Sequence, residues 1–421
     1  MRHTRTRPFR LASAAVLAVA AVALSGCTTD EGDATSTPTG EGVAYGASKE
    51  EYIAAFEDVD PVTLKFQVSG PEGSLANEGV AAYAAAVTEW SGGKIDFEWG
   101  YANSFVPAAT EWAAGLADGR IDIGLFLPYY TPDVFPEFNN LTNATFLDGN
   151  APTSTLISSA WVTEAAYSLP VYEEEAAANG IHVLALGPSV SFAGVFCSEE
   201  RTSLEDFEGV QISASGSGRV EQLTALGFSP QSIAFTELYE ALERGVVQCG
   251  STVPTALDSI GAVDLVPYMA ADPEAALVGF PSFIAIGAEK WNALPLVAQQ
   301  LMTDRLDAFL AAEAPGQGER VTEWLEKAQA AGGGILPLSD DARTALLAAN
   351  DTLLEQMKSE GVDTDALTQI FTKWKGLIND DLYPDVTTDL EEFLDAGGYG
   401  TLDYQPFVDA VFEQFLREHR P

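Results

Sequence analysis

The sequence predicts an α/β protein folded into two lobes, each a mainly parallel β-sheet flanked by helices. Short apolar strands alternate with helical segments along most of the chain, which is typical of parallel sheets covered by helices. After a leader and a polar tether, roughly 370 residues remain, which is too many for one ordinary domain and suits two. A hydrophobic content of 47% is enough for two cores.

The first lobe opens with a β-α-β-α-β series. Residues 62–68 alternate between apolar and polar side chains, and residues 95–99 do the same, which predicts two half-buried strands. Ser74 is suited to cap the helix between them. After a second helix, residues 121–127 form a near-continuous apolar run. This run predicts a third strand, buried on both faces.

A second α/β series follows, and a long helical tract comes after it. We expect strands at 182–186, 192–197, 210–213, 246–251 and 283–286, with helices at 153–168, 170–179, 204–207, 219–226 and 237–244. Residues 295–330 then read as one long helix. Three glycines at 332–334 end it, and further helices run to the end of the chain.

The first residues carry the pattern of a secretory signal that ends in a lipidation site. Four arginines precede an apolar run of fourteen residues at 11–24, and Leu24-Ser25-Gly26-Cys27 overlaps its end. This order predicts a lipoprotein signal peptide over 1–27, with Cys27 as the acylated residue. The alternative, a transmembrane anchor, needs about 20 apolar residues. Residues 28–47 are small and polar and should form a flexible tether.

The charge balance is strongly acidic. The chain has a formal net charge of −41, and loss of the four leader arginines brings it to −45. Nucleic acid is therefore excluded as a partner. Binding of an anionic ligand therefore requires local hydrogen-bond donors or cations strong enough to overcome the negative electrostatic field of the whole protein. The simpler interpretation of the acidity is a solubilising surface on an exported protein.

Two cysteines remain in the mature chain once Cys27 is lipidated. Cys197 and Cys249 each lie in a segment that reads as a strand. In an oxidising compartment this even pair predicts a disulfide, and two buried free thiols are the alternative.

Few residues suited to catalysis or metal binding are present. Only His182 and His419 lie beyond the leader, so neither a histidine triad nor a multi-histidine metal site can form. The G-x-S-x-G elbow, the phosphate loop and the dinucleotide fingerprint are also missing. We therefore expect no enzyme activity, no cofactor and no metal.

Two segments carry motifs of a known family. Residues 202–209, TSLEDFEG, are similar to "t-p-e-D-l-k-G", and residues 235–247, FTELYEALERGVV, are similar to "f-s-E-l-y-t-A-L-q-t-G-v-v". Two further segments support these two motifs: residues 119–124, which lie ahead of Tyr129-Tyr130, and residues 291–295. By these motifs the chain, over about 61–350, resembles the solute-binding proteins of tripartite ATP-independent periplasmic (TRAP) transporters, the dicarboxylate-receptor (DctP-like) family.

The resemblance implies a periplasmic-binding-protein-like fold whose two lobes close over a ligand. It implies chain crossings near Gly187 and Ile260, and a long helix that bridges both lobes. On this basis lobe I comprises 60–188 and 263–330. Lobe II comprises 189–262 and 331–421, the latter ending in a helical extension.

The sequence departs from the family at the expected ligand clamp. Relatives usually carry an arginine at the end of the strand after the first motif, where it holds a ligand carboxylate through two hydrogen bonds. Ser213 occupies that position here, and residues 191–197 contain no basic residue. One candidate replacement for the missing arginine is the set of free N–H groups at the start of the helix that follows residues 213–218, together with Arg219. The alternative is a flexible loop with Arg219 in water.

The remaining cleft positions lie at or just after strand ends, where ligands bind in parallel sheets. The full set of predicted ligand-binding residues is Ser69, Asn103, Phe126, Tyr129, Ser213, Arg219, Phe235, Ser251 and Thr252. Most are uncharged or aromatic, so the ligand is expected to be a carboxylate or a neutral or aromatic molecule. For each aromatic residue, ordinary core packing is the alternative.

These features predict a monomeric, lipid-anchored receptor on the extracytoplasmic face of the cell membrane. It hands a small organic ligand to the membrane permease subunits of a TRAP transporter. The alternatives are a receptor for an ATP-driven (ABC) importer, a sensory or adhesive lipoprotein without transport, and an extracellular enzyme that transforms its ligand.

Overall fold

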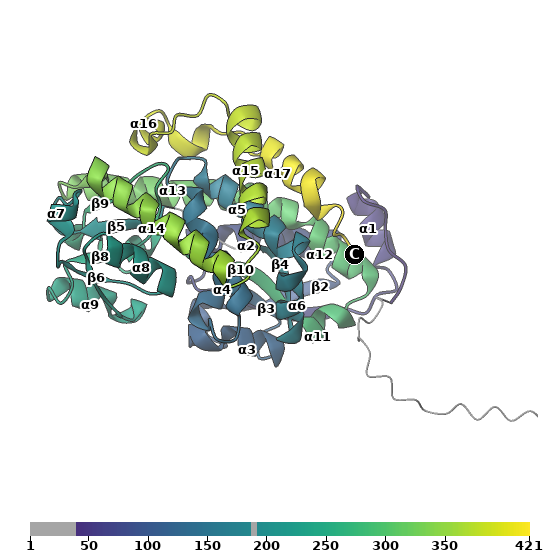
Figure 1. The fold of residues 1–421 in the computed structure, drawn as a ribbon. Coiled ribbons are helices and arrows are strands. Elements are labelled where there is room, and N and C mark those ends of the chain that lie inside the picture. The colour runs from purple at the N-terminus through teal and green to yellow at the C-terminus, as the bar shows by residue number, and fades with distance from the viewer. Residues whose placement is uncertain (1–38, 187–191) are drawn as a thin grey trace, which may run out of the picture. The chain divides into compact units, whose positions relative to one another are not determined.

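The computed structural model describes residues 39–186 and 192–421. The predicted signal peptide, Cys27, most of the tether at 28–47 and the expected crossing at Gly187 lie outside the described residues. Within these ranges the strands form two separate sheets, each flanked by helices (Figure 1). The predicted α/β fold with two lobes is confirmed.

The first sheet has five strands in the order β2-β1-β3-β10-β4. Its strands are β1 (Val62–Gln67), β2 (Ile95–Gly100), β3 (Ile123–Phe126), β4 (Ile181–Leu186) and β10 (Phe283–Gly287). The alternation in β1 and β2 buries Leu64 and Phe66 together with Ile95 and Phe97. The helices around this sheet are α1 (Lys49–Ala55), α2 (Glu78–Trp90), α3 (Trp112–Ala117), α4 (Pro136–Asn143), α5 (Ser154–Ser168), α6 (Pro170–Ala178) and α11 (Ala288–Ala293).

The second sheet has six strands in the order β11-β9-β5-β8-β6-β7. Its strands are β5 (Gly194–Cys197), β6 (Gln211–Ser213), β7 (Ser229–Gln231), β8 (Cys249–Thr252), β9 (Tyr268–Ala271) and β11 (Gly334–Pro337). Its helices are α7 (Leu204–Phe207), α8 (Ser217–Ala225), α9 (Leu238–Glu243) and α10 (Pro254–Ser259). The sequence did not predict β7, β9 and β11. β7 is three residues long and contains Pro230, so it carries no apolar pattern.

Both sheets are mixed, whereas the sequence predicted mainly parallel strands. In the first sheet β1 is parallel to β2 and β3, and β10 runs against β3 and β4. In the second, β6 is parallel to β7 and β8, and β5 runs against β8 and β9. The chain passes from one sheet to the other before β5, β10 and β11. Of these strands, β5 and β10 run antiparallel to their neighbours, whereas β11 is parallel to β9. Parallel neighbours that follow one another in a sheet need a crossover connection, whereas a strand that the chain enters from the other sheet can run in either direction.

The chain also divides between the sheets differently from the predicted lobe ranges. Residues 263–330 were expected in lobe I, but β9 pairs with β5 and β11 in the second sheet. The chain returns to the first sheet only at β10. The segment 272–282, which joins β9 to β10, is therefore a connection between the two sheets.

The long helix predicted at 295–330 is divided in two. α12 (Leu296–Asp304) ends at Arg305, and α13 (Leu306–Ala330) continues with Pro315 inside it. Phe309 of α13 packs in the core of the first sheet, and Trp324 packs in a core beside the second. Helix α13 therefore braces both lobes. Neither α13 nor any other helix in the described ranges is long and apolar enough to cross a membrane.

The C-terminal extension was predicted as part of lobe II, but it packs on both cores. It consists of α14 (Asp340–Ser359), α15 (Thr364–Gly376), α16 (Leu390–Asp395) and α17 (Gln405–Val411), with π-helical turns at Leu377–Leu382 and Phe412–Leu416. Trp374 and Phe407 join the core of the first sheet, whereas Phe393 and Tyr399 join the other. α15 lies on α5, and α17 lies on α13 (Figure 1).

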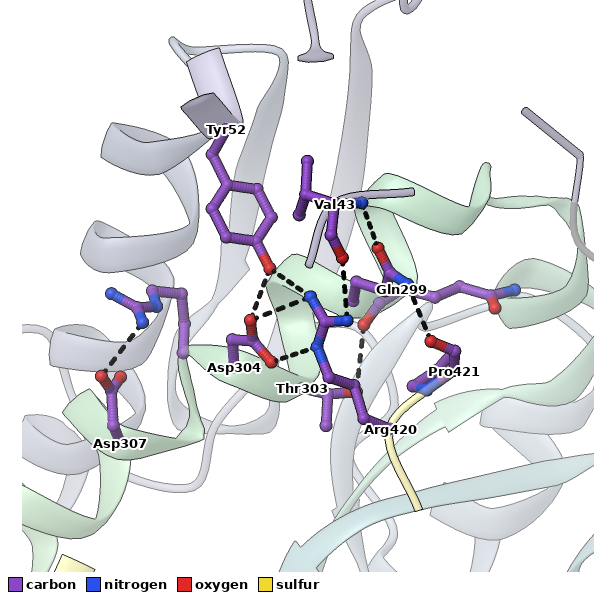
Figure 2. Close-up of polar contacts among 10 residues, drawn as sticks. Val43, Tyr52, Gln299, Thr303, Asp304, Asp307, Arg420 and Pro421 are labelled. Carbon is purple, nitrogen blue, oxygen red and sulfur yellow. Dashed lines mark hydrogen bonds and ion pairs between the residues drawn. The ribbon is translucent and has the colours of Figure 1, made fainter. Parts of the chain in front are cut away.

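A buried polar network holds the end of this extension (Figure 2). Asp304 on α12 accepts hydrogen bonds from the Nε of Arg420 at 2.7 Å and from the hydroxyl of Tyr52 at 2.5 Å. Arg420 also donates to the carbonyl of Val43 at 3.0 Å. The side chains of the ion pair are only 9% and 6% exposed. The network thus ties α1 and the segment before it, α12 and the extension together.

We expect Arg420→Met to lower the free energy of unfolding by about 2 kcal/mol, because it removes hydrogen bonds to the buried carboxylate of Asp304. Urea denaturation measures the change. Arg417→Met is the matched control, since Arg417 is exposed and makes no salt bridge within the described ranges. Equal denaturation midpoints for the two variants would show that the network adds no stability.

A disulfide links β5 to β8. Cys197 and Cys249 are direct partners in the antiparallel register, and their Cα atoms are 4.2 Å apart. Both residues are buried in a core cluster that includes Phe207 and Leu223. Of the two states that the sequence left open for these cysteines, the structure contains the bonded one.

Candidate functional site

The first sheet presents three of the predicted site residues at one edge. Ser69 follows β1, Asn103 follows β2 and Tyr129 follows β3, and these three strands are adjacent and parallel. Their carboxyl ends therefore meet at the same edge. Ser69 is exposed, whereas Asn103 and Tyr129 are half-buried.

Asn103 is held in an uncommon backbone conformation. Its φ is +60°, and the φ of Ala102 before it is +49°. The N–H of Asn103 donates to the carbonyl of Val68 at 3.1 Å, and the N–H of Ala102 donates to that of Gly70 at 3.1 Å, so the two loops support each other. The side-chain Oδ1 is buried without a hydrogen-bond partner among the described residues. Such strain and such an unpaired atom both cost free energy, and they concentrate at functional sites.

The second sheet contributes three buried hydroxyl residues. Ser213 ends β6, and Ser251 and Thr252 end β8, and each is 5% exposed. Because β6 and β8 are parallel neighbours, their carboxyl ends lie side by side. The Oγ of Ser251 is buried without a hydrogen-bond partner in the described part of the chain. These strand ends therefore bring three of the predicted site residues together in the second sheet.

Arg219 is the most unusual residue of this region. It lies in the first turn of α8, directly after the loop that follows β6, and its side chain is completely buried. The guanidinium donates to the carbonyl of Val278 and, at 3.4 Å, to that of Ser251. The described residues place no carboxylate within ion-pairing distance of Arg219, and its Nε has no partner among them. Burial lowers the pKa of Arg219 to about 9.

An aromatic group connects Arg219 to the first sheet. The guanidinium carbon lies 3.5 Å from the centroid of the Phe280 ring, a cation–π contact. The Phe280 ring in turn meets that of Tyr129 edge-on, with centroids 5.7 Å apart. Burial is the main cause that raises the pKa of the Tyr129 hydroxyl, so it stays protonated. Phe280 comes from the segment that joins the two sheets, so these contacts connect Arg219, from the second sheet's side, with Tyr129, which follows β3 of the first sheet.

The structure places Phe126 in the core and leaves the prediction for Phe235 without a supporting contact. Phe126 is 0% exposed and packs edge-on against Phe135 and Phe138, so it belongs to the core and forms no wall of the cleft. The reason is that β3 is an inner strand covered by α4. Phe235 lies in the turn before α9 and is 42% exposed. No ring contact among the described residues joins it to Tyr129 or Phe280.

Two hollows of the described surface lie elsewhere. One, of about 470 Å³, lies between α2 and β2 and is lined by residues that include Ala81, Trp99 and Tyr101. The other, of about 210 Å³, lies beside Tyr45 and Phe412. Neither contains a predicted site residue. The unpaired atoms argue for the strand ends instead, since Asn103, Arg219 and Ser251 supply three of the eight buried polar side-chain atoms left without a partner in the described chain.

Phe280 was not predicted from the sequence. This residue lies between β9 and β10, in a segment with neither a family motif nor a regular apolar period. β9 itself was not predicted, so nothing in the sequence indicated that this segment passes between the sheets.

Two α/β sheets with unpaired polar groups at their strand ends are compatible with a solute-binding protein. The sequence matches the family described as bacterial extracellular solute-binding protein, family 7, over residues 66–360. The chain belongs to this family. Among curated proteins, none matches the sequence significantly.

Solved structures agree with this assignment at the level of the fold. A marine metagenome TRAP solute-binding protein specific for aromatic acid ligands, in complex with 3-hydroxybenzoate, is 21% identical, with a TM-score of 0.63 over 75% of this chain and 98% of that one. A TRAP periplasmic solute-binding protein from Desulfovibrio salexigens is 19% identical, with a TM-score of 0.60 over 77% and 99%. One from Sulfitobacter with bound β-D-galacturonate is 16% identical, with a TM-score of 0.60 over 74% and 99%. The resemblance indicated by the motifs at 202–209 and 235–247 is confirmed.

Proposed function

We propose that this protein is the receptor of a TRAP transporter and that it binds an organic carboxylate through Arg219. The observation that carries the proposal is a fully buried guanidinium without a carboxylate partner within the described ranges. A buried cation is costly unless it is paired. A ligand carboxylate supplies the missing partner, so Arg219 takes over the role of the arginine that Ser213 replaces.

The groups around Arg219 suit an acid with an apolar, ring-bearing body. Phe280 and Tyr129 offer aromatic surface, and Ser251, whose backbone carbonyl accepts a hydrogen bond from Arg219, carries a hydroxyl without a partner among the described residues. Related structures bind acids of this size: 3-hydroxybenzoate in one and β-D-galacturonate in another. A fully neutral ligand would leave the buried charge of Arg219 unpaired, which disfavours the neutral class.

Ligand binding acts through a population shift between open and closed lobes. The ligand can contact both lobes at the same time only in the closed form. A ligand that makes contacts with both lobes therefore favours closure. The closed form then docks on the membrane permease subunits. The ligand leaves unchanged, because the site holds donors and aromatic surface but no nucleophile paired with a base. The protein is a receptor and not an enzyme.

The proposed location rests on the sequence of the leader. Signal cleavage before Cys27 and acylation of its thiol would anchor a monomeric receptor on the extracytoplasmic face of the membrane, with the residues after Cys27 as a tether. Metabolic labelling with a palmitate analogue tests this, with Cys27→Ala as the control. Label on the wild type that the variant lacks supports the anchor. Equal labelling of the two excludes it.

A thermal-shift screen tests the function itself. A ligand at a hundred times its dissociation constant stabilises the fold by about 2.7 kcal/mol. We expect ring-bearing carboxylates to raise the melting temperature, and neutral sugars and osmolytes to leave it unchanged. Recovery of the ligand unaltered after incubation distinguishes a receptor from an enzyme. Stabilisation by neutral compounds alone would overturn the proposal.

A further inference from the structure

Helix α13 passes from one core to the other at its weakest segment. Ala314 of α13 packs in the core of the first sheet, whereas Val321 packs in the core beside the second. Between them lies the sequence Pro-Gly-Gln-Gly at 315–318. A proline inside a helix removes a backbone hydrogen bond, and glycine is a poor helix former. A change in the angle between the lobes therefore bends α13 most easily at this segment.

The C-terminal extension covers the weak segment of α13. The family match ends at residue 360, so α15, α16 and α17 lie beyond it. Between α16 and α17, the 3₁₀ turn Gly398–Thr401 packs on α13. The ring of Tyr399 in this turn lies so close to Gly318 that a Cβ atom added to Gly318 would overlap it. The glycine at 318 is thus what permits the approach of the extension to the helix.

Tyr399 contacts both lobes at this point. Its hydroxyl donates to the carbonyl of Pro152 at 2.9 Å, directly before α5, which packs on β4 of the first sheet. Its ring meets that of Phe393 on α16 edge-on, with centroids 4.8 Å apart, and both rings belong to the core beside the second sheet. Tyr399 is only 3% exposed. Separating it from Pro152 would leave a buried hydroxyl without its acceptor, which is unfavourable.

The extension is fixed to the first lobe both before and after Tyr399 in the sequence. Before it, Lys373 and the Nε1 of Trp374 on α15 donate to the carboxylate of Glu164 on α5. After it, Arg420 pairs with Asp304 on α12. Between these two anchors, α16 packs in the core beside the second sheet. The extension therefore leaves the first lobe, reaches the second core and returns.

We propose that the extension is a strap that holds the two lobes in one arrangement when no ligand is bound, with Tyr399 as its contact on the weak segment of α13. A change in the lobe arrangement has to move α13 against Tyr399 or pull α16 away from the second core. The first movement breaks a buried hydrogen bond, and the second exposes apolar surface. The strap thus opposes spontaneous opening and closing, and ligand binding has to supply the free energy that overcomes it.

Double electron–electron resonance tests the strap, because it measures the distance between two spin labels, one on each lobe. Glu174→Cys on α6 and Glu205→Cys on α7 provide exposed attachment sites. A Cys27→Ala background leaves the native disulfide as the only other pair of cysteines. Without ligand, we expect one narrow distance distribution. Tyr399→Ala should widen it at least about twofold, because the variant loses both the ring and the hydroxyl that hold α13.

Three further variants assign the effect to the contact at Tyr399. Gly318→Ala adds a Cβ atom that displaces the ring, although alanine makes α13 a better helix. A wider distribution in this variant is therefore due to the lost contact and not to a softer helix. Tyr399→Phe loses only the hydrogen bond to Pro152 and should widen the distribution less than Tyr399→Ala. Tyr383→Phe is the matched control, since the Tyr383 hydroxyl donates at 2.8 Å to the carbonyl of Asp403 inside the extension.

The strap is contradicted by a broad or two-peaked distribution in the unliganded wild type. It is also contradicted if neither Gly318→Ala nor Tyr399→Phe changes the width, and this criterion decides the matter even where Tyr399→Ala does not fold. Because the measurement uses no ligand, its failure leaves carboxylate binding by Arg219 untouched. Failure of carboxylate binding likewise leaves the strap untouched.

Discussion

Arg219→Gln is expected to lower the affinity for the ligand carboxylate at least about thirtyfold. Removing one partner of a buried, hydrogen-bonded charge pair costs about 2–5 kcal/mol of binding free energy. Without ligand, the variant should be at least as stable as the wild type, because the substitution removes a buried charge that has no carboxylate partner within the described chain. Calorimetric titration and thermal melting measure the two effects.

Two further variants make this result specific. Arg219→Lys keeps the positive charge but loses the planar pair of donors, so its affinity should lie between those of the wild type and Arg219→Gln. Arg244→Gln removes an exposed arginine of the same lobe that pairs with Glu240, and it should change neither property. Lower stability of unliganded Arg219→Gln with unchanged affinity would make Arg219 a purely structural residue.

The second large effect concerns the disulfide. Replacing both Cys197 and Cys249 by alanine should reduce the free energy of unfolding by roughly 4 kcal/mol, because the bond closes a loop with a sequence separation of 52 residues. Guanidinium unfolding under oxidising conditions measures the loss. The wild type in excess reductant should approach the variant, since reduction opens the same loop.

Ligand binding gives this experiment a second readout. Ser251 lies two residues after Cys249 on β8, and its carbonyl accepts a hydrogen bond from Arg219. Loss of the bond should therefore weaken carboxylate binding as well as stability. If oxidised wild type, reduced wild type and variant unfold at the same denaturant concentration, the cysteines do not contribute a stabilising bond.

The local pattern of the chain predicted the elements that build the first sheet. The alternation at 62–68 and 95–99 and the apolar run at 121–127 correspond to β1, β2 and β3, because a strand with one buried face repeats every two residues. The same reasoning placed Ser69, Asn103 and Tyr129 beyond strand ends. It also assigned Phe126 to the cleft, because a sequence shows alternation without showing which helix covers each face.

The amino-acid sequence by itself determined the α/β class, the family, and the positions where strand ends offer polar groups. These properties depend on the local periodicity of apolar residues and on short motifs, both of which are visible in the sequence. Only the tertiary structure decided that Arg219 is buried without a carboxylate partner in the described chain, that Phe280 stacks on it, and that the extension packs on both cores. The reason is that burial and pairing depend on segments far apart in the chain, such as α8 and the connection from β9 to β10. No local pattern in either segment specifies the other.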